Sequence, residues 1–386
     1  MNDTASVLLV SHSKKQRCGI YQFGLQIATT LRASTRYSFS YAECSTEDDY
    51  RLALARSNPA VIIYNYSPTT MPWLRRGIMR RARAIQVGVI HEVTQTVADE
   101  ADDRLFEFHV APDPTLVLRN PIIFKTGRLV PTFRNDRPLP SIPTIGSFGF
   151  GTQGKGFETV ITRVQDEFDE AVIRLHIPFS DFADGDGRQA NAIAERCRGL
   201  VVKPNIRIDF SHEFLTNDQL LDFLAQNSLN AFLYNESQTG RGISSVIDYA
   251  LAVRRPIAIS RSMMFRHLHD ARPAVTFEDA RLRDIMDRGF APLARHADAW
   301  TPAALVEDYE RVVDQVLAAR QSAQARTAVG RLARSMAWEV DSFAREAKHQ
   351  VTRSRLATHV HRALERYPAV RQGLRTLRCW IDEKIR

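Results

Sequence analysis

The chain has 386 residues, of which 44% are apolar and 25% are charged, and it carries a formal net charge of +8. This length is typical of two domains of roughly 100–200 residues, and the composition is that of a globular protein with a sizeable core. No apolar run reaches the roughly 18 residues of a membrane span, so we expect no transmembrane helix.

Apolar strands and helical stretches alternate through the first half of the chain. Strands are expected at 6–10, 37–43, 60–65, 85–90 and 106–112, with helices between them at 19–33, 47–57, 71–83 and 96–105. Near-continuous apolar strands separated by helices predict a parallel sheet with helices on both faces.

The same alternation continues in the second half. Strands are expected at 143–148, 171–177, 205–211, 229–235 and 255–260, and helices at 155–168, 188–199, 216–227, 243–253 and 302–320. The stretch 130–144 carries four prolines and reads as a linker. We predict an α/β fold with two Rossmann-like domains, 1–135 and 136–325, facing a cleft, and a basic helical extension at 326–386. Ligands of such folds bind beyond the carboxyl ends of the strands.

A glycine-rich loop follows the strand at 143–148. It contains Gly149, Gly151, Gly154, Lys155 and Gly156 directly before a helix. Helix-start N–H groups and a lysine together form an anion site. The loop is not a P-loop, because glycine follows Lys155, and its G-x-G-x-x-G match lacks the acidic residue at the next strand end. The same glycines also suit a tight turn that binds nothing.

The first strand ends in a second candidate loop. Lys14, Lys15 and Arg17 precede Gly19, where a helix is expected to begin. This turn is either an anion-contacting loop that faces the first one across the predicted cleft or a basic surface loop.

The third stretch is "YNESQTGRGISSVIDYALAVRRPIAIS" at 234–260. Ser244 and Ser245 are expected in the first turn of a helix, where free N–H groups point toward the predicted cleft. Asp248 lies on the same helix, either as a ligand of the cleft or as a solvated helix residue.

This third stretch resembles the donor-binding segment of retaining GT-B glycosyltransferases of family 4 (glycosyl transferases group 1). In that family a glycine-rich loop and a helix carry a Glu-x7-Glu motif, followed by a proline and a strand. "SFGFGTQGKG" resembles the family's loop, whose lysine contacts the donor pyrophosphate, and "CGIYQFGLQIATTL" resembles its N-terminal glycine turn. "HEFLTNDQLLDFLAQNSLNAFLY" resembles the segment that lines the base pocket, and "VIHEV" the strand end with a histidine near the transferred sugar. The resemblance covers about residues 5–320.

The motif departs from the family pattern at its acids. Asp248 takes the place of the second glutamate and is one methylene shorter, and Gly240 stands where the first glutamate is expected. The arginine that usually partners the loop lysine is not evident, and Arg241 is the candidate substitute.

The resemblance implies a set of site residues with assigned roles. The catalytic set is His91, Lys155 and Asp248; the donor and phosphate contacts are Gly19, Gly149, Gly151, Gly154, Lys155, Arg241, Gly242, Ile243, Ser244 and Ser245; the base pocket is Glu213, Phe214 and Leu215; and the acceptor side is Arg17 and Glu92. A strand-end structural role is the alternative for His91. A nucleotide-sugar is the implied donor substrate, and neither a cofactor nor a metal is expected.

Charge and cysteine usage predict the location. Residues 331–386 hold 13 Lys and Arg against six Asp and Glu, a net charge of +7, on a helical pattern with an apolar stripe. This tail and the basic helix expected at 71–83 favour contact with an anionic membrane surface, although the stripe could instead pack on the first domain. The four cysteines are scattered and 1–15 lacks a signal-peptide pattern, so we expect a cytoplasmic protein, peripheral at the inner membrane face. A nucleic-acid partner is not expected, because no recognised module appears.

Two functional hypotheses follow from the sequence. The first is a glycosyltransferase that moves a sugar from a nucleotide-sugar to a polysaccharide or lipid-linked glycan, with retention. The second is a catalytically degenerate GT-B module that acts as a binding partner in glycan assembly. A GT-B-shaped epimerase is disfavoured, because Glu92, Asp113 and Glu236 are too scattered to supply its acid and base groups.

Overall fold

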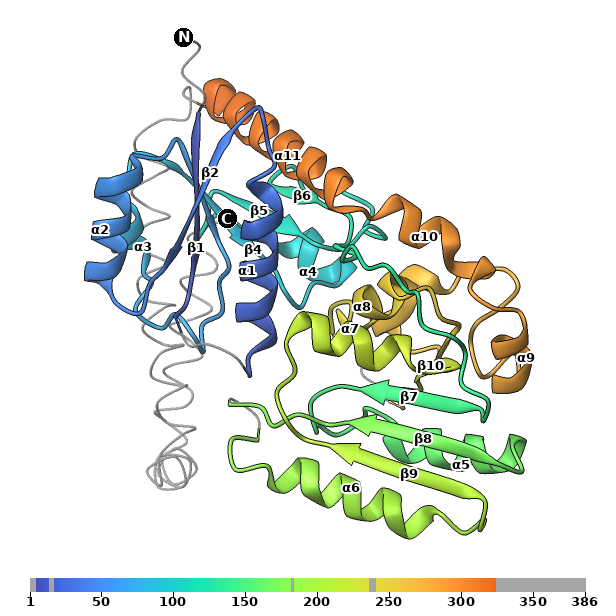
Figure 1. Cartoon of the computed structure of the whole chain (residues 1–386). Helices are drawn as coiled ribbons and strands as arrows, with labels where there is room; N and C mark the ends of the chain where they lie inside the picture. The colour runs from blue at the N-terminus through green and yellow to red at the C-terminus, as the bar shows by residue number, and fades with distance from the viewer. Residues whose placement is uncertain (1–4, 14–16, 182–183, 236–240, 324–386) are drawn as a thin grey trace, which may run out of the picture. The chain divides into compact units, whose positions relative to one another are not determined.

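The computed structural model of the chain describes residues 5–13, 17–181, 184–235 and 241–323 (Figure 1). The predicted extension at 326–386 lies outside them. Two parallel sheets, each with helices on its faces, make up the described residues, which confirms the predicted α/β class.

The first sheet has the strand order β2-β1-β3-β4-β5-β6. Its strands are β1 (Ser6–Ser11), β2 (Ser38–Glu43), β3 (Val61–Tyr64), β4 (Ile85–Val89), β5 (Phe108–Ala111) and β6 (Ile123–Lys125), and each neighbouring pair is parallel. Successive side chains of β1 enter different cores: Val7 and Leu9 pack in one cluster, and Leu8 and Val10 in another. Burial on both faces explains why these strands are apolar without alternation.

Helices cover both faces of this sheet. The α1 helix (Gly19–Leu31) and the α11 helix (Pro302–Ala323) share a cluster with Val7 and Leu9. The opposite face is covered by α2 (Glu47–Ser57) and the short α3 (Arg76–Met79). Figure 1 shows α11 beside α1, so the chain returns to the first sheet after it has built the second. The domain boundaries at 135 and 325 stay a prediction.

The second sheet has the order β11-β10-β7-β8-β9, again all parallel. Its strands are β7 (Thr144–Phe148), β8 (Ala171–His176), β9 (Ile206–Ser211), β10 (Leu229–Phe232) and β11 (Ile257–Ile259). The chain runs from β7 to β8 on one side and from β10 to β11 on the other. The neighbouring strands β7 and β10 therefore form the switch point of the sheet. Ligands of such sheets bind at the carboxyl ends of the strands there.

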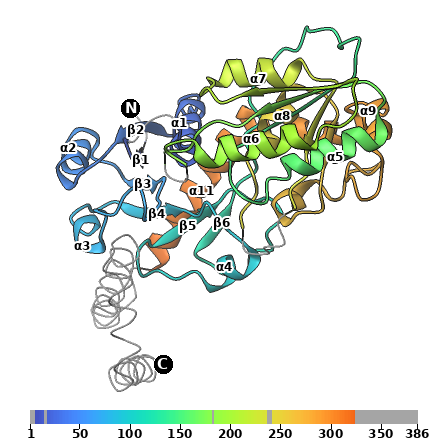
Figure 2. The ribbon, with the colours of Figure 1, turned by 90° about the horizontal axis from the view of Figure 1, so that it is seen from below.

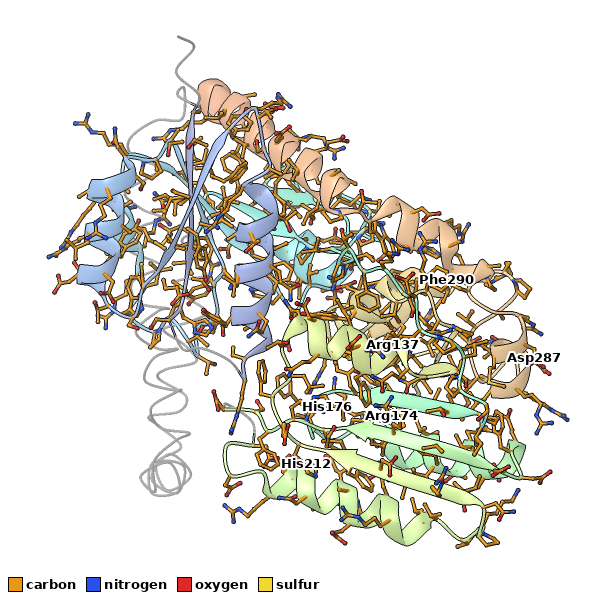
Figure 3. All side chains as sticks on the ribbon, viewed as in Figure 1. Arg137, Arg174, His176, His212, Asp287 and Phe290 are labelled. Atoms are coloured by element: carbon orange, nitrogen blue, oxygen red, sulfur yellow. The ribbon has the colours of Figure 1, made fainter. Side chains whose placement is uncertain are left out.

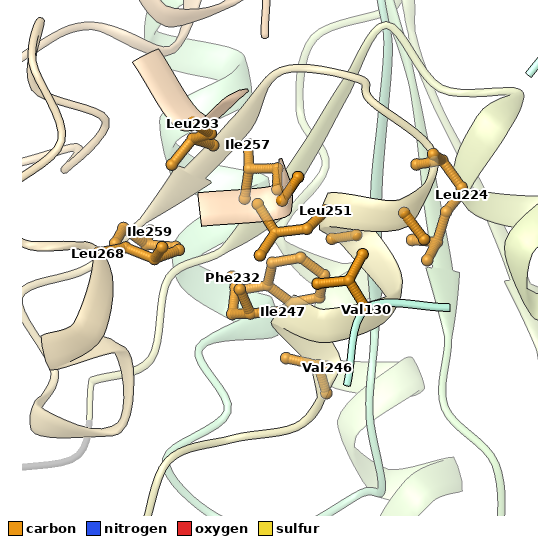
Figure 4. Packing of buried hydrophobic residues seen from close by; sticks show 14 of the residues in the cluster. Val130, Leu224, Phe232, Val246, Ile247, Leu251, Ile257, Ile259, Leu268 and Leu293 are labelled. Atoms are coloured by element: carbon orange, nitrogen blue, oxygen red, sulfur yellow. The ribbon is translucent and has the colours of Figure 1, made fainter. Parts of the chain in front are cut away.

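The second sheet is also packed on both faces (Figure 2). The α5 helix (Phe157–Glu167) and α6 (Arg188–Leu200) bury one face, and α7 (Asn217–Ala225) and α8 (Val246–Ala252) bury the other. Figure 4 shows Phe232 of β10 against Ile247 and Leu251 of α8. This packing fixes where the segment before α8 meets the carboxyl end of β10.

Several local predictions were wrong. The predicted helix at 71–83 is helical only at Arg76–Met79, and the one at 243–253 begins at Val246. Some elements were not expected from the sequence: β6 and the segments between β11 and α11, which are η1 (Met263–Leu268), α9 (Leu282–Asp287), η2 (Ala291–Leu293) and α10 (Ala294–Ala299). These elements are short, so they carry little periodic signal.

Candidate functional site

The glycine loop lies at the switch point of the second sheet and is tightly packed. Gly156 has a φ of 67°, and a Cβ there would lie 1.8 Å from the Leu233 carbonyl oxygen. A Cβ on Gly151 would lie 2.7 Å from Cα of Ala190. The loop therefore needs these two glycines to pass the end of β10 and the first turn of α6. The predicted contacts of Gly149, Gly151 and Gly154 with a phosphate stay a prediction.

Lys155 is held by the residue that follows β10 by two positions. Its ammonium nitrogen lies 3.1 Å from the Tyr234 hydroxyl and 4.3 Å from the centroid of the same ring. The Tyr234 hydroxyl is also 3.3 Å from Oγ of Ser244. Tyr234 and Ser244 are buried, whereas Lys155 is only half-buried. Residues of the β7–α5 and β10–α8 connections thus meet at one point, and Tyr234 was not among the site residues expected from the sequence.

The segment 241–245 precedes α8 and touches the first half of the chain. A Cβ on Gly242 would lie 2.4 Å from the carbonyl oxygen of His91, so Gly242 packs on the backbone of 91–93. Ser244 donates its N–H to the Met264 carbonyl at 3.1 Å, and Ser245 is the exposed residue at the start of α8. The predicted free amide at Ser244 is therefore wrong, because η1 supplies an acceptor. Arg241 and Ile243 are half-buried in the same segment.

Asp248 is buried in α8 and bonds to an arginine of the segment that follows β6. Its carboxylate accepts two hydrogen bonds from Arg128, from Nε at 3.1 Å and from an Nη at 2.6 Å. Arg128 also donates to the Pro112 carbonyl at 2.7 Å. Burial raises the pKa of the Asp248 carboxyl, and the Arg128 guanidinium opposes that shift. The predicted solvated alternative for Asp248 is excluded, and its predicted role in donor binding is untested.

The residue after Asp248 contacts α1. The Tyr249 hydroxyl bonds to the Gln26 side-chain amide and lies 3.2 Å from the Asn217 amide oxygen. Its ring meets Phe148, the last residue of β7, edge to face at 6.1 Å between centroids. Tyr249 thus links α1 to α7 and to the end of β7. Tyr249 was not predicted from the sequence, because no local pattern marks a tyrosine as a contact between distant segments.

His91 and Glu92 follow β4 at the carboxyl edge of the first sheet. The His91 ring meets Phe23 edge to face at 5.2 Å, and its Nε2 is buried with no hydrogen-bond partner among the described residues. Burial, and to a lesser extent the positive charges of Arg128 and His12, lower the pKa of His91 to about 4. The imidazole is therefore neutral at pH 7. Glu92 is exposed.

Arg17 and Gly19 face residues of the second sheet's loops. A Cβ on Gly19 would lie 4.0 Å from the ring of Phe150, in the glycine loop. Arg17 lies 4.0 Å from the Asp181 carboxylate and stacks on Phe179 at 5.8 Å. The two predicted loops therefore approach each other, as the sequence analysis expected for 17–19. Lys14 and Lys15 lie outside the described residues.

The comparisons with known proteins agree with this arrangement. No family model and no curated protein sequence matches the chain. The fold is similar to a glycosyltransferase from Rickettsia africae (TM-score 0.58, 9% identity, 82% of this chain and 99% of that one). It is also similar to Anabaena HepE in complex with UDP (TM-score 0.55, 12% identity, 80% of this chain and 99% of that one). A third similar structure is sucrose-phosphate synthase from Thermosynechococcus elongatus (TM-score 0.55, 12% identity, 82% of this chain and 100% of that one). The chain has the GT-B glycosyltransferase fold.

The predicted base pocket of this GT-B fold lies between β9 and α7. Glu213 is exposed, whereas Phe214 and Leu215 are half-buried, and Leu215 packs against the core under α8. His212 stacks on Phe179 at 5.4 Å. Figure 3 labels His212 together with His176 and Arg174 of β8. Contact of 213–215 with a base stays a prediction.

One partly exposed arginine joins the loops of the two GT-B sheets. Arg266 of η1 bonds to the fully buried carboxylate of Asp113, which follows β5. It also donates to the carbonyls of Val93 at 3.0 Å and Arg241 at 3.3 Å. A single guanidinium thus fixes segments after β4, β5 and β10. Sequence reasoning missed it because η1 carries no motif.

Within the described ranges, no three His, Cys, Asp or Glu side chains gather as a metal site would require. No helix of this part of the chain is both long and apolar enough to cross a bilayer. The predicted independence from metal ions remains untested.

Proposed function

We propose that the protein is a glycosyltransferase that takes a sugar from a nucleotide-sugar and transfers it, with retention, to a polysaccharide or lipid-linked glycan. The main support is the position of Lys155, whose ammonium is held on Tyr234 at the switch point of the second sheet. A cation at this edge suits a diphosphate. The likeness to HepE in complex with UDP supports a nucleoside diphosphate as that group.

In this proposal the bond between the anomeric carbon and the diphosphate oxygen breaks, and its electron pair stays on the diphosphate. The Lys155 ammonium and Arg241 stabilise the growing negative charge. One such preorganised donor contributes about 3 kcal/mol to lowering the barrier. The acceptor hydroxyl oxygen forms the new bond on the same face of the sugar, and its proton passes to the leaving phosphate. These reaction steps require neither a protein base nor a metal ion.

The roles of the remaining predicted residues in this proposal come from the family resemblance. His91 would lie near the transferred sugar, Glu92 and Arg17 would face the acceptor, and residues 213–215 would hold the base. The reaction takes place in the cytoplasm, at the inner face of the membrane.

Calorimetric titration with UDP, GDP, ADP and their sugar conjugates tests the proposal. The wild type should bind at least one of them, and Lys155→Ala should weaken that binding roughly tenfold or more, because charged hydrogen bonds contribute about 1.5–3 kcal/mol. The matched control is Lys203→Ala, which removes a lysine that bonds to the Phe168 carbonyl near the amino end of β9. A wild type that binds no nucleotide would contradict the proposal.

One observation favours a second candidate, a GT-B binding module without transferase activity. Both carboxylate oxygens of Asp248 are engaged by Arg128, and Gly240 offers no side chain as a first acid. The two candidates differ in turnover. Release of nucleoside diphosphate from a bound nucleotide-sugar, in the presence of glycan acceptors or water, supports the transferase. Binding without release under the same conditions supports the module.

A further inference from the structure

Tyr234 is contacted at its ring and at its hydroxyl. The centroid of the Phe265 ring lies 4.6 Å from that of Tyr234, and the Lys155 ammonium lies 4.3 Å from the Tyr234 centroid. The loop that carries Lys155 is tied to the same point, because the Asn235 N–H donates to the Gly154 carbonyl at 3.1 Å. Tyr234 and Lys155 are therefore fixed relative to each other by backbone as well as side-chain contacts.

The chemistry of these groups sets the direction of the hydrogen bonds. An ammonium has donors only, so Lys155 donates to the Tyr234 oxygen at 3.1 Å. An oxygen that accepts from a cation becomes a stronger donor through its own proton. The group within reach of that proton is Oγ of Ser244, at 3.3 Å. Oγ of Ser244 then accepts a hydrogen bond from the Tyr234 hydroxyl, so the serine hydroxyl proton can be donated to another group.

We propose that Tyr234 is a positioning residue of the anion site, which passes the orienting effect of Lys155 to Ser244 so that the serine hydroxyl donates to the diphosphate. Lys155 and Ser244 come from segments on different strands, β7 and β10, and Tyr234 connects them. An anion placed beside them meets two donors whose protons are already aimed at it. Such preorganisation removes the cost of reorienting the hydroxyl when the ligand binds. This inference rests on the proposed function, since it assumes that a nucleoside diphosphate is the ligand.

Tyr234→Phe tests this role, because it keeps the ring under Lys155 and removes only the hydroxyl. The probe is whichever of UDP, GDP and ADP gives the largest wild-type response in calorimetry, compared with its monophosphate and its nucleoside. We expect the diphosphate Kd to rise about tenfold, as for the loss of one charge-assisted hydrogen bond. The Kd of the nucleoside should stay unchanged. Tyr41→Phe, on β2 of the first sheet, is the matched control and should leave both constants unchanged.

A double-mutant cycle with Ser244→Ala separates positioning from a general structural role. If Tyr234 acts through Ser244, the double variant should bind the diphosphate no more weakly than Ser244→Ala alone. Additive losses, or an equal loss of nucleoside binding in Tyr234→Phe, would overturn the inference and leave the proposed function standing. A wild type that responds to none of the diphosphates would overturn both. Unfolding temperatures within about a degree of the wild type confirm that the variants are folded.

Discussion

Asp248 is the residue for which a structural role and a functional role make opposite predictions. Its carboxylate and the Arg128 guanidinium are both buried, at 8% and 5% side-chain exposure, and bond to each other. Removing one partner of a buried ion pair leaves the other charge uncompensated, which costs about 3–5 kcal/mol. We therefore expect Asp248→Asn to lower the free energy of unfolding by roughly 3 kcal/mol in urea denaturation.

The control for this prediction replaces both partners. Arg128→Met combined with Asp248→Leu should recover most of the lost stability, because an apolar pair carries no buried charge. If Asp248 instead serves the donor, Asp248→Asn should weaken nucleotide binding while the unfolding midpoint stays within experimental error of the wild type. That result would contradict the structural role.

At the same scale, the sequence predicted some site residues and missed their partners. Lys155 and Ser244 both follow carboxyl ends of parallel strands, so their proximity follows from the fold class. Arg128 is 120 residues from Asp248, in a segment without a regular element, and no local pattern connects the two. Tyr234 lies in the stretch 234–260 but was not predicted as a site residue, because its role depends on its contact with Lys155 in the folded chain.

Among the elements, the segment 71–83 differs most from its prediction. Five arginines and several apolar residues indicated a basic helix for a membrane surface, yet only Arg76–Met79 is helical. Leu74 and Met79 are buried in the core under α2, with 4% and 1% exposure. Apolar side chains that fill a core are unavailable to lipid. The sequence pattern was therefore that of a core-packing segment with a basic outer surface.

Leu74→Ala distinguishes a core segment from a membrane-binding helix. As a core truncation it should lower the free energy of unfolding by about 2–4 kcal/mol, measured in urea. Leu118→Ala, at an exposed leucine of the same half, is the matched control and should cost far less. Unchanged stability of Leu74→Ala, together with weaker binding to anionic vesicles, would show that Leu74 faces lipid after all.

For the whole chain, the sequence predicted the two parallel sheets correctly because long apolar strands and intervening helices repeat with a clear period. It predicted a helix at 302–320, but not that this helix, α11, packs on the first sheet. Leu305, Tyr309, Val312 and Val316 of α11 complete the core of the first sheet. That return depends on packing between segments some 300 residues apart along the chain, roughly between β1 and α11, and a pattern of local periodicity carries no such information.

The net charge of the whole molecule comes from the residues after α11. Residues 324–386 carry 14 of the 52 Lys and Arg and six of the 44 Asp and Glu, so the first 323 residues carry 38 of each and have no net charge. Attraction to an anionic surface contributes about 1 kcal/mol for each nearby basic side chain. Any general electrostatic attraction of the full chain to such a surface must therefore come mainly from 324–386.

Co-sedimentation with vesicles containing an anionic lipid tests this whole-molecule prediction. The full chain should pellet with these vesicles and should be released by about 0.5 M salt, because salt shortens the range of charge interactions to a few ångströms. A chain ending at Ala323 keeps α11 and should remain in the supernatant. Vesicles of zwitterionic lipid are the control and should pellet neither form. Equal pelleting of the two forms on anionic vesicles would contradict the prediction and place the membrane contact on the first 323 residues. Local basic clusters would then have to bind the vesicles, although these residues have no net charge.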